Sequence, residues 1–361
     1  MIFLGDIPPP LHGMSAINKQ MLDEIKKHKK VFFINTSPTL LSRYYHTRFW
    51  LLIKAIYFIP VTILLLWAII FRREKVLYRS LNGGYGQVFD FCWLSIARLF
   101  ALKVFLHHHA ALYLTSRSKL FDAICKITNF NAVHIVLGDA MHDALSTNYN
   151  IDQKKIRILS NAAFFKINDA KKLKSNPNEI VRIGYLANLS LSKGIDVFLK
   201  TITHLNGKGL KFEAIVAGPC HDSVIRAQLD TACSQLSELK YVGGLYGSDK
   251  DNFFEALDCF IYPSRNEAEP LVIYEAAVEG ALVLSSEAGC MKSSAQRLQG
   301  WSMPLDSPDV WAEAAANKIL LSSEAMGLSS REIRKEVFYN FAAEARENLD
   351  RIIKEMVHAK A

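Results

Sequence analysis

Two glutamates, Glu267 and Glu275, lie eight positions apart, the first between two apolar segments of the chain and the second within the later segment. The run 258–262 before them predicts a strand, and the run 271–279 predicts a helix that ends at a glycine. Pro270 suits the first turn of that helix, because proline lacks the N–H that would be unpaired there. One carboxylate is therefore expected on a loop and the other about one turn inside a helix.

The start of this helix offers free N–H groups and the positive end of the helix dipole, which together favour an anion such as a diphosphate. A carboxylate beside a phosphate is useful only where it accepts hydrogen bonds from hydroxyl groups. A nucleotide sugar has a diphosphate as well as sugar and ribose hydroxyls, so the pattern favours this ligand class. The alternative is an ordinary loop and an amphipathic helix with two solvated glutamates.

The stretch 263–276 resembles the Glu-x7-Glu motif of family 4 glycosyltransferases, which have the GT-B fold. The shared positions are Pro263, Ser264, Glu267, Pro270, Leu271, Glu275 and Ala276, and Ala268 stands where the family commonly has glycine. The resemblance implies transfer of a sugar from a UDP- or GDP-linked donor with retention at the anomeric carbon, with no required metal and no cofactor. It assigns the sugar hydroxyls to Glu267 and the ribose to Glu275. The donor would lie along Ala268, Glu269, Pro270, Leu271 and Val272.

A second segment, 186–194, follows a predicted strand and opens a helix. It resembles the family's loop that carries an arginine and a lysine for the donor diphosphate. Lys193 and Gly194 match, whereas Asn188 and its neighbours occupy the region of the arginine. Lys193 is therefore expected to balance the leaving diphosphate, with help from backbone N–H groups and Arg265. Gly218 resembles the family's strand end near the nucleotide base.

Near the N-terminus, residues 6–16 form a proline-rich loop that opens a helix. The loop resembles the Pro-Pro-x-His-Gly-x-Ser segment of some polysaccharide glycosyltransferases of this family, where it faces the cleft near the donor phosphate and the acceptor. The resemblance places Gly13 at the donor and His12 and Ser15 at the acceptor. The alternative is a rigid turn with an incidental histidine.

Three histidines, His107, His108 and His109, end the predicted strand 103–108. Ligands of open α/β sheets bind at the carboxyl ends of strands. The family has a histidine there that faces the reacting sugar, and His109 is the first choice for this catalytic role, with His108 as the second. Adjacent side chains on a strand point to opposite faces, so the three cannot share one task. A metal site made by His107 and His109, or a structural role for all three, are the alternatives.

Strands and helices alternate in both halves of the chain, which predicts an α/β fold with two parallel sheets covered by helices. The predicted strands are 1–5, 31–35, 76–79, 103–108, 131–138, 155–159, 181–186, 212–217, 239–242, 258–262 and 282–285. The resemblance implies GT-B architecture, in which two Rossmann-like domains face a cleft and a C-terminal helix crosses back. The expected boundaries are 1–165 for the acceptor-side domain, 166–180 for a linker, 181–335 for the donor domain and 336–361 for the crossover helix.

The charge of the 361-residue chain, +8 overall, is concentrated in one block. Residues 26–89 contain eleven Lys or Arg and one acid, Glu74, and they also contain the uncharged apolar run 55–71. Basic residues that flank an apolar run favour an anionic membrane surface over nucleic acid, for which no recognition motif is present. The apolar run allows three interpretations: a membrane span, a soluble helix packed on the sheet, or a helix that packs on the domain and dips into the lipid interface.

No leader peptide is visible at the N-terminus, and the six cysteines lack a Cys-x-x-Cys pair, which indicates free thiols in a reducing cytosol. The expected location is the cytoplasm, peripherally on the inner face of the plasma membrane, with a lipid-linked or oligosaccharide acceptor in the synthesis of polysaccharide or lipopolysaccharide. Two alternatives to this enzyme are a donor- or glycan-binding protein that has lost turnover and an enzyme of phosphorolysis. The latter is disfavoured because no lysine-rich cofactor segment is present.

Overall fold

The computed structural model describes residues 1–359 apart from 45–48, 130, 167–179 and 324–325. The chain forms two compact units, of which unit 1 comprises Met1–Phe164 with Glu344–Ala361 and unit 2 comprises Phe165–Ala343. The predicted linker, 166–180, lies outside the described residues except for its first and last positions.

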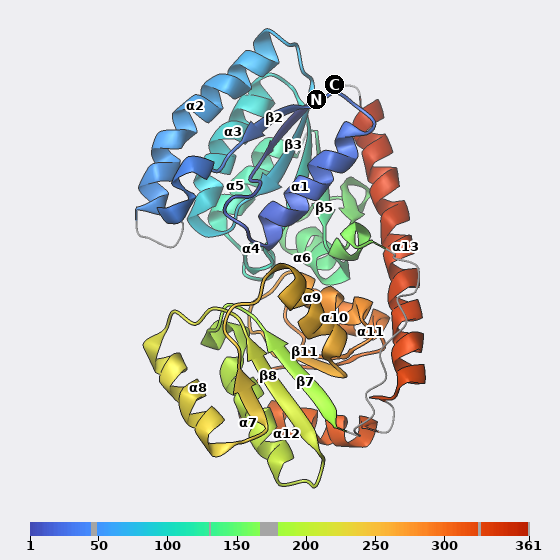
Figure 1. Ribbon diagram of the computed structural model, residues 1–361. Helices are drawn as coiled ribbons and strands as arrows, with labels where there is room; N and C mark the ends of the chain where they lie inside the picture. Colours follow the sequence, from blue (N-terminus) through green and yellow to red (C-terminus); the bar gives the residue numbers. More distant parts are fainter. Residues whose placement is uncertain (45–48, 130, 167–179, 324–325, 360–361) are drawn as a thin grey trace. The chain divides into compact units, whose positions relative to one another are not determined.

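Unit 1 is built on a six-stranded parallel sheet with the order β2-β1-β3-β4-β5-β6 (Figure 1). Its strands are β1 (Ile2–Gly5), β2 (Phe32–Asn35), β3 (Val76–Leu81), β4 (Lys103–His108), β5 (Ala132–Val136) and β6 (Ile156–Ile158). The direction of strand addition reverses between β1 and β3, and such a reversal opens a crevice at the carboxyl ends of the two strands.

The helices of unit 1 are α1 (Gly13–Lys26), α2 (Trp50–Ile70), α3 (Gln87–Leu99), α4 (Leu112–Thr115), α5 (Lys119–Thr128), α6 (Asp139–Tyr149) and the last part of α13 (Leu328–His358). A buried ion pair fixes α3 to the sheet: Arg79 of β3 donates from Nε to the carboxylate of Asp90 at 2.7 Å, and both side chains are fully buried. The backbone N–H of Asn82 donates to the other oxygen of Asp90 at 2.9 Å. These additional donors matter because a buried carboxylate needs all of its lone pairs occupied.

Unit 2 contains a second six-stranded parallel sheet with the order β12-β11-β10-β7-β8-β9. Its strands are β7 (Val181–Leu186), β8 (Phe212–Ala217), β9 (Leu239–Tyr241), β10 (Cys259–Tyr262), β11 (Leu282–Ser286) and β12 (Trp301–Met303). The reversal in this sheet falls between β7 and β10. The carboxyl ends of these two strands are therefore the expected place for a ligand.

The helices of unit 2 are α7 (Ile195–Asn206), α8 (Ser223–Gln235), α9 (Gly247–Ala256), α10 (Leu271–Val278), α11 (Met291–Arg297), α12 (Pro308–Ser322) and the first part of α13 (Leu328–His358). Arg331 of α13 donates to the carbonyls of Glu255 at 2.9 Å and Glu279 at 3.1 Å, and Arg334 donates to that of Gly280 at 2.8 Å. The arginines thus satisfy carbonyls at the ends of α9 and α10 that have no partner within their own helices.

The expected alternation of strands and helices is confirmed in both units, and the differences are local. The helix expected over 87–102 ends at Leu99, because Ala101 adopts a left-handed backbone conformation with φ 53° that a helix cannot continue through. The helices α4, α5 and α11 and the strand β12 were not expected. Of these, α4, α11 and β12 are short, at four, seven and three residues, and thus provide little periodic signal.

Gly194, between the loop after β7 and helix α7, brings two backbones into contact. Its φ is +79°, and a Cβ atom at this position would lie 2.0 Å from the carbonyl oxygen of Pro263, which follows β10. Only glycine permits both this conformation and this approach. Gly194 therefore holds together the two loops that flank the reversal of the sheet.

We expect Gly194→Ala to destabilise the protein more than Gly209→Ala does. Gly209 has a φ of +76°, but a Cβ there meets nothing within 4 Å. The control substitution should cost about 1–2 kcal/mol for the left-handed backbone alone. Gly194→Ala should cost about 1–3 kcal/mol more, since its methyl group must displace a backbone. Urea unfolding of the two variants measures the difference, and equal midpoints would contradict the close approach.

Candidate active site

The motif residues of unit 2 gather where the two central strands of its sheet diverge. The loop after β7 carries Lys193, and the loop after β10 carries Glu267, so that the two residues flank the reversal of the sheet. The side chain of Lys193 forms an ion pair with Oε1 of Glu267 across this point. Residues 74 positions apart in the chain are thereby brought into one polar cluster.

Two further side chains donate to the same oxygen of Glu267. The hydroxyl of Tyr262 donates at 2.6 Å and that of Ser264 at 3.3 Å. Burial raises the pKa of the Tyr262 hydroxyl well above its usual value, and the adjacent Glu267 carboxylate raises it further. Tyr262 therefore stays protonated and acts as a donor. The carboxylate remains held by Tyr262 and Ser264 if Lys193 turns to another anion.

Helix α10 begins directly after this cluster. Its N-cap is Pro270, which provides no side-chain hydrogen bond to the first turn, where Leu271 and Val272 are half-buried. Gly289 lies so close behind the loop that a Cβ atom there would be 2.1 Å from the carbonyl oxygen of Glu267. The arrangement combines a lysine, a held carboxylate and an uncapped helix start, which suits an anion that also carries hydroxyl groups.

Glu275, the second motif glutamate, lies at the fifth position of α10. Lys250 of α9 donates to its Oε1 at 2.6 Å, whereas its Oε2 is buried and has no hydrogen-bond partner among the described residues. A buried carboxylate oxygen without a donor is costly. This oxygen is suited to accept a hydrogen bond from a ligand hydroxyl.

Arg265 is engaged away from this cluster. Its guanidinium donates to both carboxylate oxygens of Asp196 at 2.8 Å, and these hydrogen bonds raise its pKa. It would have to release Asp196 to reach a diphosphate. Asn188, in the region where the resembling family has an arginine, is exposed. Lys193 is therefore the cation that this loop presents to the motif glutamate.

The other donor-side positions predicted from the sequence have mainly packing contacts. Gly218, with φ +122°, would place a Cβ atom 1.7 Å from the carbonyl oxygen of Ala187, so the ends of β7 and β8 pack backbone to backbone. Ala268 and Glu269 are buried, and the hydroxyl of Tyr274 donates to Glu269 at 2.5 Å. Glu269 thus supports the loop from inside.

In unit 1, His12 and Ser15 form a capping box at the start of α1. The N–H of Ser15 donates to Nδ1 of His12 at 3.2 Å, and the N–H of His12 donates to Oγ of Ser15 at 3.0 Å. Ser15 is fully buried, which fits a structural role, whereas Gly13 is exposed and has open space around it. Burial lowers the pKa of His12, although the nearby Asp6 opposes the shift.

The histidines that end β4 differ in their surroundings. His107 shares a hydrogen bond of 2.6 Å with Tyr78, and His108 contacts both Tyr113 and His134 at 3.0 Å, with both histidine side chains fully buried. Burial lowers the pKa values of both, so that they are neutral. These contacts favour a structural role for His107 and His108 over contact with an acceptor.

His109 is the half-buried member of the triplet, and it packs against His107 with ring centroids 4.1 Å apart. Its Nε2 has no hydrogen-bond partner among the described residues. Burial of the ring and the neighbouring His12 lower its pKa. A neutral imidazole with an unused nitrogen is suited to a ligand contact, which keeps His109 as the first choice.

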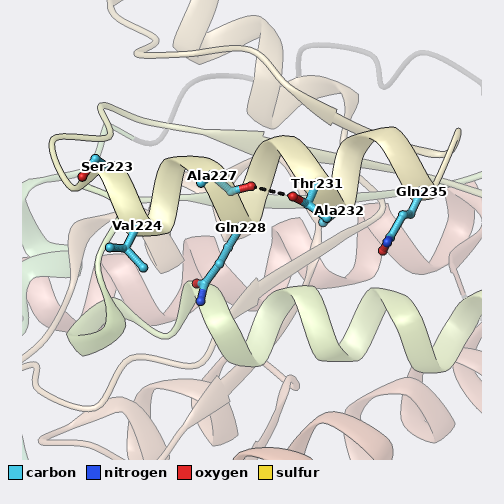
Figure 2. A pocket seen from close by; sticks show the side chains of 7 residues that line it. All are labelled: Ser223, Val224, Ala227, Gln228, Thr231, Ala232 and Gln235. Carbon is cyan, nitrogen blue, oxygen red and sulfur yellow. Dashed lines mark hydrogen bonds between the residues drawn. The ribbon is translucent and has the colours of Figure 1, made fainter.

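Two other kinds of site, a surface hollow and a metal site, lack the side chains for catalysis or metal binding among the described residues. A shallow hollow along α8 is lined by Ser223, Val224, Ala227, Gln228, Thr231, Ala232 and Gln235 (Figure 2). All of these residues belong to one helix, and none carries a charge. Among the described residues, no group of three or more His, Cys, Asp or Glu side chains is arranged to hold a metal ion.

Residues 165–335 match the family model described as Glycosyl transferases group 1. This segment belongs to that glycosyltransferase family. The resemblance inferred from the sequence is therefore confirmed for the glycosyltransferase segment, which contains Lys193, Glu267 and Glu275.

Among curated proteins, the chain is similar to EpsF of Bacillus subtilis (strain 168), whose name assigns it to the glycosyltransferases. The two are 23% identical over 216 residues, which are 56% of this chain and 54% of that protein. The chain thus matches about half the length of this relative.

Solved glycosyltransferases share the fold over almost the whole chain. Anabaena HepE, crystallised with UDP-glucose, has 14% identity and a TM-score of 0.65, with 98% of this chain and 99% of that chain covered. The lipopolysaccharide outer core galactosyltransferase WaaB has 12% identity and a TM-score of 0.69, with 98% and 99% covered. Sucrose-phosphate synthase of Thermosynechococcus elongatus has 14% identity and a TM-score of 0.71, with 99% of both chains covered. The α/β fold of GT-B type is confirmed by these likenesses.

Two residues of the glycosyltransferase segment were not identified from the sequence: Tyr262, which holds Glu267, and Lys250, which holds Glu275. Tyr262 was assigned to the strand before the motif, and its donor role depends on the turn that follows. Lys250 lies 25 positions before its partner, on another helix. A carboxylate with one buried oxygen needs such partners, but the sequence does not specify which donors provide them.

We expect the stability of the protein to fall between pH 7 and pH 5. Burial lowers the pKa of His134 to about 3 and those of His107 and His108 well below the usual value. The unfolded chain, with histidine pKa values of about 6.5, binds more protons, so stability is complete above pH 6.5 and is lost as the pH falls. Each such histidine should cost about 2 kcal/mol at pH 5.

Urea midpoints at pH 7 and pH 5 measure this change. His134→Gln should reduce the pH dependence by about one proton, whereas His28→Gln, at an exposed histidine, should leave it as in the unmodified chain. Equal stability of the unmodified chain at the two pH values would refute the assignment of neutral buried histidines.

Proposed function

We propose that the protein is a retaining glycosyltransferase that moves a sugar from a nucleotide-sugar donor to a lipid-linked or oligosaccharide acceptor in the synthesis of cell-surface polysaccharide. The observation that carries this proposal is the Lys193–Glu267 pair at the sheet reversal of unit 2, beside the uncapped start of α10. The match of residues 165–335 to a glycosyltransferase family supports it.

The proposed reaction breaks the bond between the sugar and the diphosphate, so positive charge grows on the sugar and negative charge on the phosphates. Preorganised positive groups at the diphosphate supply much of the rate in such reactions. We assign this task to Lys193 and the N–H groups at the start of α10, where Leu271 and Val272 lie. The donor phosphate itself assists the deprotonation of the acceptor.

Donor binding in this scheme exchanges one ion pair for another. Lys193 turns from Glu267 to the diphosphate, and the carboxylate then accepts hydrogen bonds from the sugar hydroxyls. Tyr262 and Ser264 keep Glu267 in place during the exchange. The ammonium group meets an anion before and after binding, so the exchange does not leave a charge without a partner.

The second glutamate provides the ribose contact in this proposal. The buried Oε2 of Glu275 accepts from a ribose hydroxyl, and Lys250 holds the other oxygen. UDP is the favoured carrier, because the fold is shared with Anabaena HepE, which was crystallised with UDP-glucose and with UDP. In unit 1, His12 is assigned to the acceptor, Gly13 to the donor and His109 to the catalytic contact with the reacting sugar.

A second candidate function is a nucleotide-sugar- or glycan-binding protein on the same fold. The position of Arg265 favours it, since this guanidinium is bound to Asp196 and residues 186–194 contain no arginine. Lys193 alone would then balance the leaving diphosphate. Donor binding without turnover would distinguish the binding protein from the enzyme.

Thermal unfolding with UDP-, GDP-, CMP- and dTDP-sugars tests the proposal first. A ligand at a hundred times its dissociation constant adds about 2.7 kcal/mol of stability. We expect the unfolding temperature to rise with UDP-sugars and to change little with CMP-sugars. Absence of a shift with any donor would contradict the proposed donor site.

We expect Lys193→Ala and Glu267→Ala each to reduce sugar transfer at least about a hundredfold, the cost of losing one preorganised electrostatic group. Lys200→Ala is a matched control, because Lys200 is also paired with an acid, Asp309, but on α7 and α12. Its transfer rate should stay within about twofold of that of the unmodified protein. Near-normal turnover of Lys193→Ala would rule out its assignment.

A further inference from the structure

Helix α2 has an apolar face that the described residues of its unit leave exposed. Large apolar side chains that are 42–72% exposed recur every three or four positions along and just beyond the helix: Phe49, Leu52, Ile56, Ile59, Ile63, Leu64, Trp67, Ile70 and Phe71. Successive positions on a helix turn by 100°, so this spacing gathers them on one side. We call these nine residues the outer face of α2.

The opposite side of α2 is apolar as well and packs on unit 1. Val61, Leu65, Ala68 and Ile69 are buried, and Phe58 stacks on Trp93 of α3 with ring centroids 5.2 Å apart. In Figure 1, α2 lies along α3 on the outer side of unit 1. The inner side holds the helix on unit 1. The outer face can be removed from water only by contact with an apolar surface outside the unit.

Within the described residues, one helix is long and apolar enough to cross a membrane, namely the part of α2 from Leu52 to Ile70. Its inner side is committed to contacts with unit 1, which a span surrounded by lipid would have to give up. The alternative is for the helix to lie along a membrane. At about 1.5 Å per residue, its 19 residues present an apolar strip about 28 Å long.

The surroundings of the outer face are basic. Lys30, Arg72, Arg73 and Lys75 are exposed at the end of α2 and before β2. The guanidinium of Arg72 lies 5.1 Å from the ring of Phe32, and Phe32 packs on Trp67 at 5.5 Å, which places this cationic cluster beside the outer face.

The acid nearest to this cluster in the chain, Glu74, is already paired. Its carboxylate is bound to the amino group of Met1 and lies 3.9 Å from Arg72. A second copy of the chain would meet the outer face with the same cations and with no acid among residues 49–73. Anionic lipid headgroups beside an apolar interior match both the charge and the apolar strip.

We propose that the outer face of α2 docks the protein on an anionic membrane, with the helix in the plane of the interface. The cytoplasmic leaflet, which carries the negative surface potential, is the surface that fits. Docking deepens the proposed function by bringing unit 1 to a lipid-linked acceptor. Only the biological role of docking rests on the proposed function. Docking itself is measured as vesicle binding, without donor, acceptor or turnover.

Flotation of the full chain with vesicles tests the proposal, using phosphatidylcholine alone and phosphatidylcholine with 30% phosphatidylglycerol. We expect strong binding to the anionic vesicles that weakens with salt. The double variant Ile59→Glu/Ile63→Glu should bind at least about tenfold more weakly, because it places charges in the apolar strip. Leu99→Glu is the matched control, since Leu99 is an exposed residue of α3 in the same unit, and it should bind like the unmodified chain.

The charge contribution has its own pair of variants. Arg72→Gln/Arg73→Gln should weaken binding to anionic vesicles about 25-fold, at about fivefold for each cation near the surface. Lys119→Gln/Lys154→Gln removes two exposed cations of the same unit elsewhere and should change binding less than about threefold.

Four outcomes would overturn the proposal. These are absence of vesicle binding, equal binding to neutral and anionic vesicles, unchanged binding of the Ile59→Glu/Ile63→Glu variant, and a dimer of the unmodified chain that this variant dissociates. If the protein binds vesicles but transfers no sugar, the docking proposal stands and only the proposed glycosyltransferase function is refuted.

Discussion

The carboxylate of Glu267 is the centre on which the donor half of the molecule depends. One of its oxygens accepts from Lys193, Tyr262 and Ser264, which belong to the loop after β7, to β10 and to the turn after β10. The two loops can meet only because the strands diverge there and because Gly194 lets their backbones touch. The first turn of α10, which no side chain caps, follows directly, so that sheet topology, a glycine and a hydrogen-bond cluster jointly produce one polar site.

Much of this arrangement could be predicted from local sequence. Strand boundaries were mostly right to within one or two residues, because buried strands are apolar runs that end at polar or small residues. Glu267, Glu275 and Lys193 were found by their spacing and by a family motif. The partners Tyr262 and Lys250 were missed, because a hydrogen bond between distant segments leaves no periodic signal. Arg265 was expected at a diphosphate, but its fork geometry matches the carboxylate of Asp196, which the sequence does not place beside it.

Unit 1 combines two features that appear contradictory for a folded domain in water. Its interior contains neutral histidines and a buried ion pair, whereas its surface carries the apolar outer face of α2. The polar interior is stabilised by hydrogen bonds between buried side chains, such as those of His108 with Tyr113 and His134. Composition alone left three interpretations of the apolar run open, since a helix that is apolar all round does not reveal which side its own domain covers.

Helix α13 has a consequence for how the two units unfold. Its residues up to Ala343 belong to unit 2 and those from Glu344 onward to unit 1, within one continuous helix of 31 residues. If either unit melts, the half of the helix that packed on it loses its support, and helix propagation is cooperative along the chain. The arginines that bind carbonyls at the ends of α9 and α10 lie on the same helix. The folding free energies of the two units are thus coupled through the backbone of α13, and the stability of each unit depends on whether the other is folded.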